Sequence, residues 1–224
     1  MDINTDIQAE ETVNTVSIMG DTYFEPISIL LEELKNHHKN SNGCTNAYVN
    51  GFASSVCILS VVCLESYVMR VRYKNQATQD EIKKPVSEYL TNLYPDFPNK
   101  DELEEVFVIR DILAHNHLWE MSFLPVAGQG MKFIESNKKN GGDKKYINRV
   151  DSSSKLTKKL GLNIIPTEIG MLDAKAVIQT IWKILLFLEN KNINQCYVSG
   201  SWVKHNGQMM KFCDVIRLPE TWGI

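Results

Sequence analysis

Several features that define common protein classes are missing from this chain of 224 residues. It has no Walker or Rossmann glycine-rich loop, no G-x-S-x-G motif and no C-x-x-C pair, so nothing in it points to a phosphate-binding loop, an α/β-hydrolase or a zinc ribbon. Its five cysteines are odd in number, and Cys57 and Cys63 lie in an apolar segment, where cysteine behaves as a small hydrophobe. We therefore expect no metal site, no disulfide framework and no cofactor.

We also expect no leader peptide and no hydrophobic run long enough to span a membrane. Its N-terminus is polar and acidic, without the basic and apolar regions of a signal peptide. The most apolar stretch, residues 51–64, is shorter than the about 20 residues that cross a bilayer, and it leads directly into Glu65. We expect this stretch to be a buried helix in a reduced, cytoplasmic protein that does not associate with membranes.

The overall charge is close to neutral but unevenly distributed. A composition of 43% hydrophobic and 23% charged residues is typical of globular domains and argues against disorder, coiled coil or collagen. The formal charge of −3 hides two opposite regions: residues 1–34 hold eight acidic and no basic side chains, whereas residues 132–159 hold nine Lys and Arg against three acids. A pI near 6.0 therefore does not exclude a nucleic-acid partner.

Hydrophobic spacing predicts a mainly α fold with short hairpins. The pattern predicts helices over about 24–36, 45–73, 78–94, 172–189 and from 99 to a point before 124. It also predicts a hairpin of residues 122–126 and 131–134, a polar loop over 136–159, and a C-terminal hairpin that turns at Asn206-Gly207.

One domain is expected from this length, after an acidic flexible tail over residues 1–20. The domain spans residues 21–224, with residues 125–165 as a basic loop and hairpin insertion and residues 195–218 as the C-terminal β-hairpin.

The predicted helix that starts near residue 99 carries an arginine in its apolar stripe. Arg110 lies in the middle of the stripe, where a charge is costly unless it meets an anion or another partner. One interpretation is a structural ion pair with a carboxylate of the bundle, for which Glu65 is the candidate. The apolar stripe consists of Leu103, Val106, Phe107, Leu113 and Ala114.

The segment from Arg110 to His117 resembles the signature of the HEPN superfamily, an arginine followed by a polar residue and then by a histidine after four to six intervening residues. Asp111 is the polar residue, and four residues separate Arg110 from His115 and six from His117. The resemblance covers about residues 22–122 and 170–190 and implies an antiparallel helical bundle. In the toxin branch of the family a tyrosine commonly stands where this chain has His117, so modification of a tyrosine at that position is not supported.

The resemblance further implies a homodimer in which two motifs form one composite site for metal-independent RNA cleavage. A histidine would transfer the proton of the ribose 2′-OH and an arginine would stabilise the phosphorane, giving a 2′,3′-cyclic phosphate. It assigns proton transfer to His115, transition-state stabilisation to Arg110 and orientation to Asp111. His117 would be a second histidine of the site or a substrate contact, and which histidine transfers the proton stays open. Glu65 would position Arg110.

The family setting implies a toxin or an abortive-infection effector of phage defence, with an antitoxin or sensor protein as a further partner. An alternative is a non-catalytic HEPN-like module for dimerisation or for RNA or nucleotide binding. A third is a helical scaffold in which Arg110 is simply a buried ion pair.

The basic segment has two interpretations. It is either a solvated loop or a flexible arm that holds RNA phosphates and speeds association. In the second case the RNA-binding side chains are Lys138, Lys139, Lys144, Lys145 and Arg149.

Overall fold

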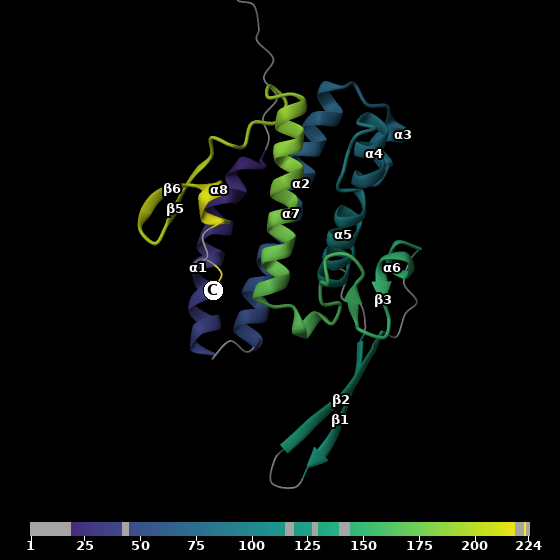
Figure 1. Ribbon diagram of the computed structural model, residues 1–224, viewed down its shortest axis with the longest axis vertical. Helices are drawn as coiled ribbons and strands as arrows, with labels where there is room; N and C mark the ends of the chain where they lie inside the picture. Colours follow the sequence, from purple (N-terminus) through teal and green to yellow (C-terminus); the bar gives the residue numbers. More distant parts are fainter. Residues whose placement is uncertain are drawn as a thin grey trace, which may run out of the picture.

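The computed structural model describes residues 19–41, 45–114, 119–126, 130–138, 144–217 and 222. The fold is mainly helical with short antiparallel hairpins, as the hydrophobic spacing predicts. Four longer helices form the body: α1 (Phe24–Asn40), α2 (Ala47–Lys74), α5 (Lys100–Ala114) and α7 (Met171–Lys191). Helix α2 packs against the other three and forms the centre of the bundle (Figure 1). Residues 1–18 of the predicted acidic tail lie outside the described residues.

Helix α2 is the core helix expected from the apolar run, but it is much longer than that run. It begins after Asn46, whose side-chain oxygen accepts hydrogen bonds from the amides of Tyr48 and Val49. Its buried side chains extend from Val49 to Arg72. Within the described part of the chain it is the one helix long and apolar enough to cross a membrane. The shortness of the apolar run, from which we expected no span, is therefore not an argument against one. Its contacts with α1, α5 and α7 show it as the centre of a helical core.

The single helix predicted over residues 78–94 is wrong, because the structure has two. Helix α3 (Gln79–Lys83) is closed by a capping box between Thr78 and Glu81, and α4 spans Val86–Leu93. Pro85 lacks an amide proton and disfavours helical backbone in the residue before it, so Lys84 adopts an extended conformation with ψ 147°. The break leaves the carbonyl of Lys84 free to accept a hydrogen bond from outside the helix.

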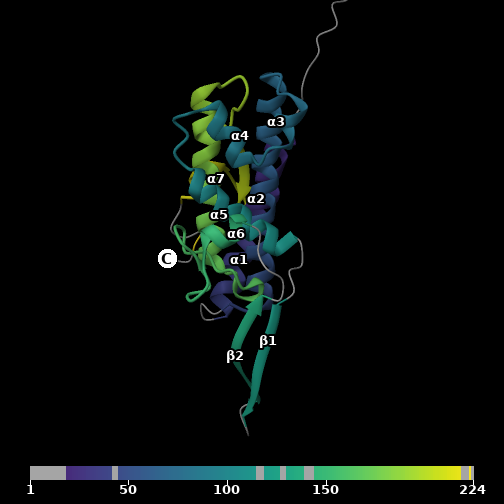
Figure 2. The ribbon, with the colours of Figure 1, turned by 90° about the vertical axis from the view of Figure 1, so that its right-hand side faces the viewer.

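The hairpin predicted around residue 128 is present and longer than expected. Strand β1 (Trp119–Val126) pairs antiparallel with β2 (Gly130–Lys138), and the register places Phe123 opposite Phe133. Trp119 therefore belongs to a strand and not to the preceding helix as expected, since cross-strand pairing outweighs its helical periodicity. Both views of the molecule show this hairpin projecting beyond the ends of the helices (Figures 1 and 2).

The expectation of a polar loop over residues 136–159 is wrong in its described part. Strand β2 continues to Lys138, and a short helix α6 spans Lys144–Arg149. Strands β3 (Val150–Asp151) and β4 (Leu156–Thr157) then pair with each other, and the short 3-10 helix η2 (Pro166–Glu168) leads to α7. The physical reason is that Arg149 and Lys159 of this segment contact carboxylates on α5.

The C-terminal hairpin turns at Asn206-Gly207, which confirms that prediction. Strand β5 (Trp202–His205) pairs with β6 (Gln208–Lys211), and both turn residues have positive φ angles of 48° and 78°. The hairpin ends at Lys211 and not at residue 218 as expected, because Phe212 begins a short helix α8 (Phe212–Val215). The ring of Phe212 stacks on that of Phe24, with their centroids 4.5 Å apart.

The hairpin is joined to α1 by a buried histidine. His205 is 1% exposed, and its Nδ1 lies 3.1 Å from the hydroxyl of Ser28 and 3.4 Å from a carboxylate oxygen of Glu32. Burial lowers the pKa of His205 below its ordinary value of 6.5, although the carboxylate of Glu32 opposes this shift. The folded protein therefore favours the neutral imidazole.

This burial predicts a stability that falls with acidification. Between the folded pKa and 6.5 the unfolded chain binds more protons at His205 than the folded chain, so the contribution is complete above pH 6.5 and is lost as the pH falls below it. Urea unfolding should show that the advantage of wild type over His205→Gln is larger at pH 7.5 than at pH 5.5. An advantage that stays constant over this range would contradict the assignment.

Candidate functional site

Arg110 lies in the last turns of α5 and contacts the central helix α2. Its Nη2 donates a hydrogen bond to Oε1 of Glu65 at 3.0 Å, and its Nη1 lies 2.9 Å from Oδ1 of Asp111. The side chain of Arg110 keeps 27% exposure, so the pair lies at the edge of the core rather than within it. The structure thus brings together Glu65, Arg110 and Asp111, which the sequence assigned to one site.

The charges continue from this pair into α6. Nζ of Lys145 donates a hydrogen bond to Oδ2 of Asp111 at 2.6 Å, so acidic and basic groups alternate in the order Glu65, Arg110, Asp111, Lys145. Both cations also face the ring of Phe107, at 5.1 Å for Arg110 and 5.6 Å for Lys145. A network of this kind fixes long side chains better than an isolated surface pair does.

A cleft of about 230 Å³ opens beside this network, between α2, the start of α4, α5 and α6. We call it the basic cleft, because four of its side chains are basic and one is acidic. It is lined by Glu65, Arg72, Lys84, Pro85, Val86, Ser87, Phe107, Arg110 and Lys145. Its size and charge suit a small anionic group rather than a large apolar ligand.

Arg72 is the most buried cation of the basic cleft. The residue is 6% exposed, its Nη2 donates a hydrogen bond to the carbonyl of Lys84 at 2.6 Å, and its guanidinium covers the ring of Tyr89 at 4.8 Å. A further contact joins Nη1 to the sulfur of Met69 at 3.6 Å. Burial lowers the pKa of Arg72, whereas Tyr89 and Glu65 favour its charged form.

Two donors in this region lack a partner among the described residues. The Nε atoms of Arg72 and Arg110 are both buried and donate to no acceptor there. A buried unpaired donor costs roughly 1–3 kcal/mol, and an acceptor brought into the site would recover part of that cost. The basic cleft therefore combines positive charge with unsatisfied hydrogen-bonding capacity.

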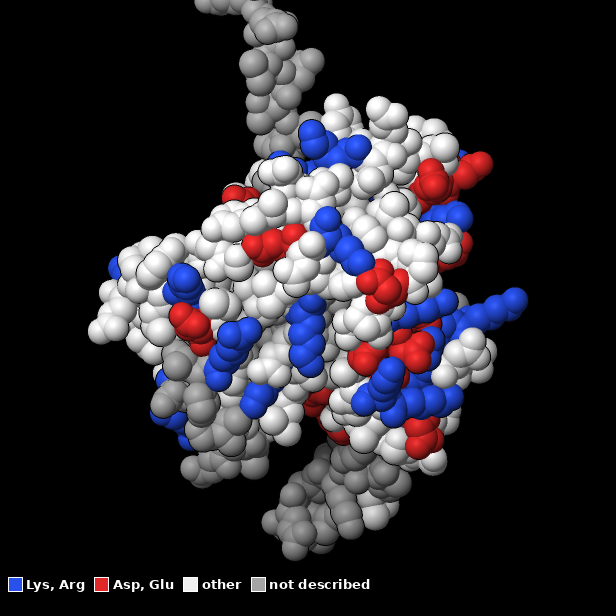
Figure 3. Space-filling model, turned by 45° about the horizontal axis from the view of Figure 1, so that its top comes forward, with Lys and Arg blue, Asp and Glu red and all other residues white. Residues whose placement is uncertain are grey.

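The segment after the projecting hairpin is docked on the acidic side of α5. Arg149 contacts Asp101 at 2.6 Å and Glu104 at 2.7 Å. Further along the segment, the carboxylate of Glu105 accepts hydrogen bonds from the amides of Lys159 and Leu160 at 2.9 and 2.8 Å. Figure 3 shows the acidic and basic side chains interleaved on the right-hand side of the molecule, where α5 and α6 lie in Figure 1. Residues 144–160, the docked segment, are thus held on the bundle rather than free in solvent.

The structure brings only some of the residues predicted to act on RNA together. Lys145 joins Arg110 and Asp111 at the basic cleft, whereas Arg149 pairs with the acids near the start of α5 and Lys144 is exposed on α6. Lys138 ends strand β2. The remaining three predicted residues, His115, His117 and Lys139, lie outside the described residues.

Sequence reasoning missed Arg72 and Lys84 as parts of this site. Arg72 lies seven residues after Glu65, so the two share a face of α2. That spacing was a usable signal, but a basic residue in the last turns of a helix is also explained by the helix dipole. Lys84 gave no signal, because its place in the cleft depends on the break at Pro85.

Comparisons of the chain with protein-family models, with curated proteins and with solved structures found no match. Within the described ranges no three His, Cys, Asp or Glu side chains lie close enough to hold a metal ion, and the thiols of Cys57, Cys63, Cys196 and Cys213 are free. The mainly helical fold is shown by the structure itself.

The docked segment yields a prediction about Arg149. Because two carboxylates hold its guanidinium, Arg149→Met should lower the free energy of unfolding by about 1 kcal/mol, as expected for a partly buried charged pair. The matched control Lys144→Met removes an exposed cation of the same helix and should change stability by less than about 0.5 kcal/mol. Urea denaturation measures both. Unchanged stability in Arg149→Met, together with weakened RNA binding, would instead assign Arg149 to an RNA interface.

Proposed function

We propose that this chain is a metal-independent endoribonuclease with an HEPN-like bundle, acting as a toxin or abortive-infection effector. The observation that carries the proposal is the position of Arg110, the first residue of the R-x4-6-H pattern. Glu65 and Asp111 hold it at the wall of a cleft rich in positive charge. The biological setting comes from the resemblance alone, and so do the roles of His115 and His117.

In the proposed reaction the phosphoryl group passes from the 5′-oxygen of one nucleotide to the 2′-oxygen of the preceding nucleotide. A histidine, His115 in this proposal, accepts the proton of the 2′-OH, and the 2′-oxygen attacks the adjacent phosphorus. The bond from phosphorus to the 5′-oxygen breaks, and a second imidazole in its protonated form donates a proton to that oxygen. The products are a 2′,3′-cyclic phosphate and a 5′-hydroxyl, so the substrate must be RNA.

Arg110 suits the role of stabilising the charge on the phosphorane. Its contacts with Glu65 and Asp111 use both terminal nitrogens, but each of these carries a second N–H, and Nε has no partner among the described residues. A guanidinium that is already oriented loses less conformational entropy when a phosphate binds. The two carboxylates then act through Arg110 and are positioning residues.

A structural role for Arg110 is the competing proposal, and a specific observation favours it. The same two carboxylates that orient the guanidinium also neutralise it, as in a bundle whose helices are joined by an ion pair. In that case the protein is a non-catalytic HEPN-like module or a scaffold, and Arg110 contributes to stability alone.

Cleavage of RNA in the presence of EDTA tests the proposal. Wild type should cleave and leave 2′,3′-cyclic phosphate ends, whereas Arg110→Ala and His115→Ala should each lose about 100-fold or more in rate. His117→Ala shows whether that histidine shares the proton transfer. Arg217→Ala serves as the matched control, because it removes an exposed arginine that is far from Arg110 in the sequence.

The outcomes separate the candidates when folding is measured alongside. Lost cleavage with unchanged thermal unfolding supports the ribonuclease. A wild-type protein that binds RNA and leaves it intact favours the non-catalytic module. An Arg110→Ala protein that unfolds far more easily, with no cleavage by wild type, favours the scaffold.

We propose that the active form is a homodimer joined in part by the projecting hairpin. The register pairs Phe123 with Phe133 and shifts between Ser122 and Phe123. The two strands carry the apolar residue types Trp119, Met121, Phe123 and Phe133, which suit a contact between two copies of the chain. The hairpin also follows directly after the histidines of the motif, so pairing two hairpins would bring two motifs near each other.

This arrangement predicts that the hairpin controls the oligomeric state. Wild type should sediment at twice the chain's 25.6 kDa, and the double variant Phe123→Ser/Phe133→Ser should shift to the monomer while keeping its helical circular dichroism. Met209→Ser changes an exposed apolar residue of the other hairpin and is the control. A double variant that remains dimeric would exclude the hairpin as the contact.

A further inference from the structure

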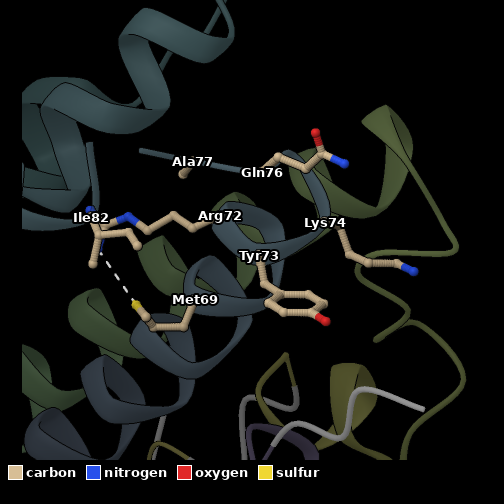
Figure 4. A pocket seen from close by; sticks show the side chains of 7 residues that line it. All are labelled: Met69, Arg72, Tyr73, Lys74, Gln76, Ala77 and Ile82. Carbon is tan, nitrogen blue, oxygen red and sulfur yellow. Dashed lines mark hydrogen bonds between the residues drawn. The ribbon is translucent and has the colours of Figure 1, made fainter. Parts of the chain in front are cut away.

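A second hollow adjoins the basic cleft at the C-terminal end of α2. Its volume is about 540 Å³, and it is lined by Met69, Arg72, Tyr73, Lys74, Gln76, Ala77 and Ile82. We call it the outer hollow. Figure 4 shows the side chain of Arg72 extending toward Ile82, with Tyr73, Lys74 and Gln76 on the other side of the helix end.

Arg72 lines both hollows and connects them. The described hydrogen bonds of its guanidinium go to the carbonyl of Lys84 and the sulfur of Met69, neither of which is an anion. Glu65 acts on this guanidinium from a distance, but no described carboxylate hydrogen-bonds to it, so at 6% exposure it keeps positive charge available for an anion. The unpartnered Nε adds a donor without an acceptor. This point of the surface therefore favours an anion between the two hollows.

The lining of the outer hollow differs from that of the basic cleft. Tyr73 is 64% exposed and Met69 46% exposed, although both are large side chains of the central helix α2. Lys74 provides a further positive charge, and Gln76 provides an amide that both donates and accepts hydrogen bonds. An exposed ring with a nearby cation and amide is suited to the face and edge of a nucleobase.

We infer that single-stranded RNA runs from the basic cleft over Arg72 into the outer hollow, with a phosphate beside Arg72 and Lys84 and the adjoining base against Tyr73. This subsite rests on the proposed function, since it extends the strand beyond the phosphate that Arg110 contacts. It assigns to Tyr73, Lys84 and Arg72 the binding of a nucleotide next to the cleaved one. Duplex RNA does not suit the subsite, because its bases are stacked and paired and cannot reach Tyr73.

The experiment measures binding without cleavage. A fluorescent oligoribonucleotide with 2′-O-methyl groups at every position has no attacking hydroxyl, so its affinity reports binding without cleavage. Fluorescence anisotropy is recorded at several salt concentrations for wild type, Tyr73→Ala, Lys84→Gln, Arg72→Lys and the control Tyr48→Ala. Tyr48 is 67% exposed at the opposite end of α2 and tests whether any exposed tyrosine matters.

The two contacts predict different signatures. Tyr73→Ala should weaken binding about fivefold to 150-fold and leave the salt dependence unchanged, because stacking releases no counterions. Lys84→Gln should reduce the slope of log K against log salt by about 0.7, as expected for one lost phosphate contact on a single strand. Arg72→Lys keeps the charge and should retain most of the salt slope. Binding by Tyr73→Ala and Lys84→Gln that equals wild type would overturn the subsite.

Failure of the subsite and failure of the proposed function give different results. If Lys84→Gln and Tyr73→Ala bind like wild type while His115→Ala abolishes cleavage in EDTA, the ribonuclease stands and the RNA path is wrong. If binding depends on both residues but wild type never cleaves RNA, the subsite stands and the protein is a binding module. Weakened binding of a matching duplex by Tyr73→Ala, equal to that of the single strand, would also overturn the single-strand assignment.

Discussion

The contact between Arg110 and Glu65 is the constraint on which the candidate site depends. It joins α5 to the central helix α2 and fixes a guanidinium at the boundary between core and solvent. Asp111 and Lys145 extend the contact into α6, so one network sets the positions of three helices around the basic cleft. Because each charge in the network faces an opposite one, its cations can stay ordered without being deeply buried.

The same principle explains the segment that looked like a free basic arm. Its cations are matched by the acids in the first turns of α5, which also suit the positive end of the helix dipole. Ion pairs with Glu104 and Glu102 neutralise much of the positive charge of Arg149 and Lys159. Arg72 differs, since the acceptors of its described hydrogen bonds are neutral, although the nearby carboxylate of Glu65 favours its charged form.

Much of the fold could be predicted because it depends on local patterns. Hydrophobic periodicity located α1, α2, α5 and α7, and Asn206-Gly207 located a turn, since each signal acts within a few residues. Pro85 is also a local signal for a helix break, but the apolar periodicity on both sides of it predicts one continuous helix. Helical periodicity predicts an α5 that continues to Trp119, but Trp119 lies in β1 and pairs with Lys138 of β2.

The sequence by itself determined the mainly α class, the central apolar helix, the C-terminal turn, and Glu65 as the partner of Arg110, because a costly charge in an apolar stripe has few solutions. The tertiary structure alone decided that Arg72 and Lys84 share a cleft with Arg110, and that the basic segment lies on α5. Those contacts join residues distant in the chain. Their formation depends on how helices pack and where a proline interrupts one, and no local pattern records either.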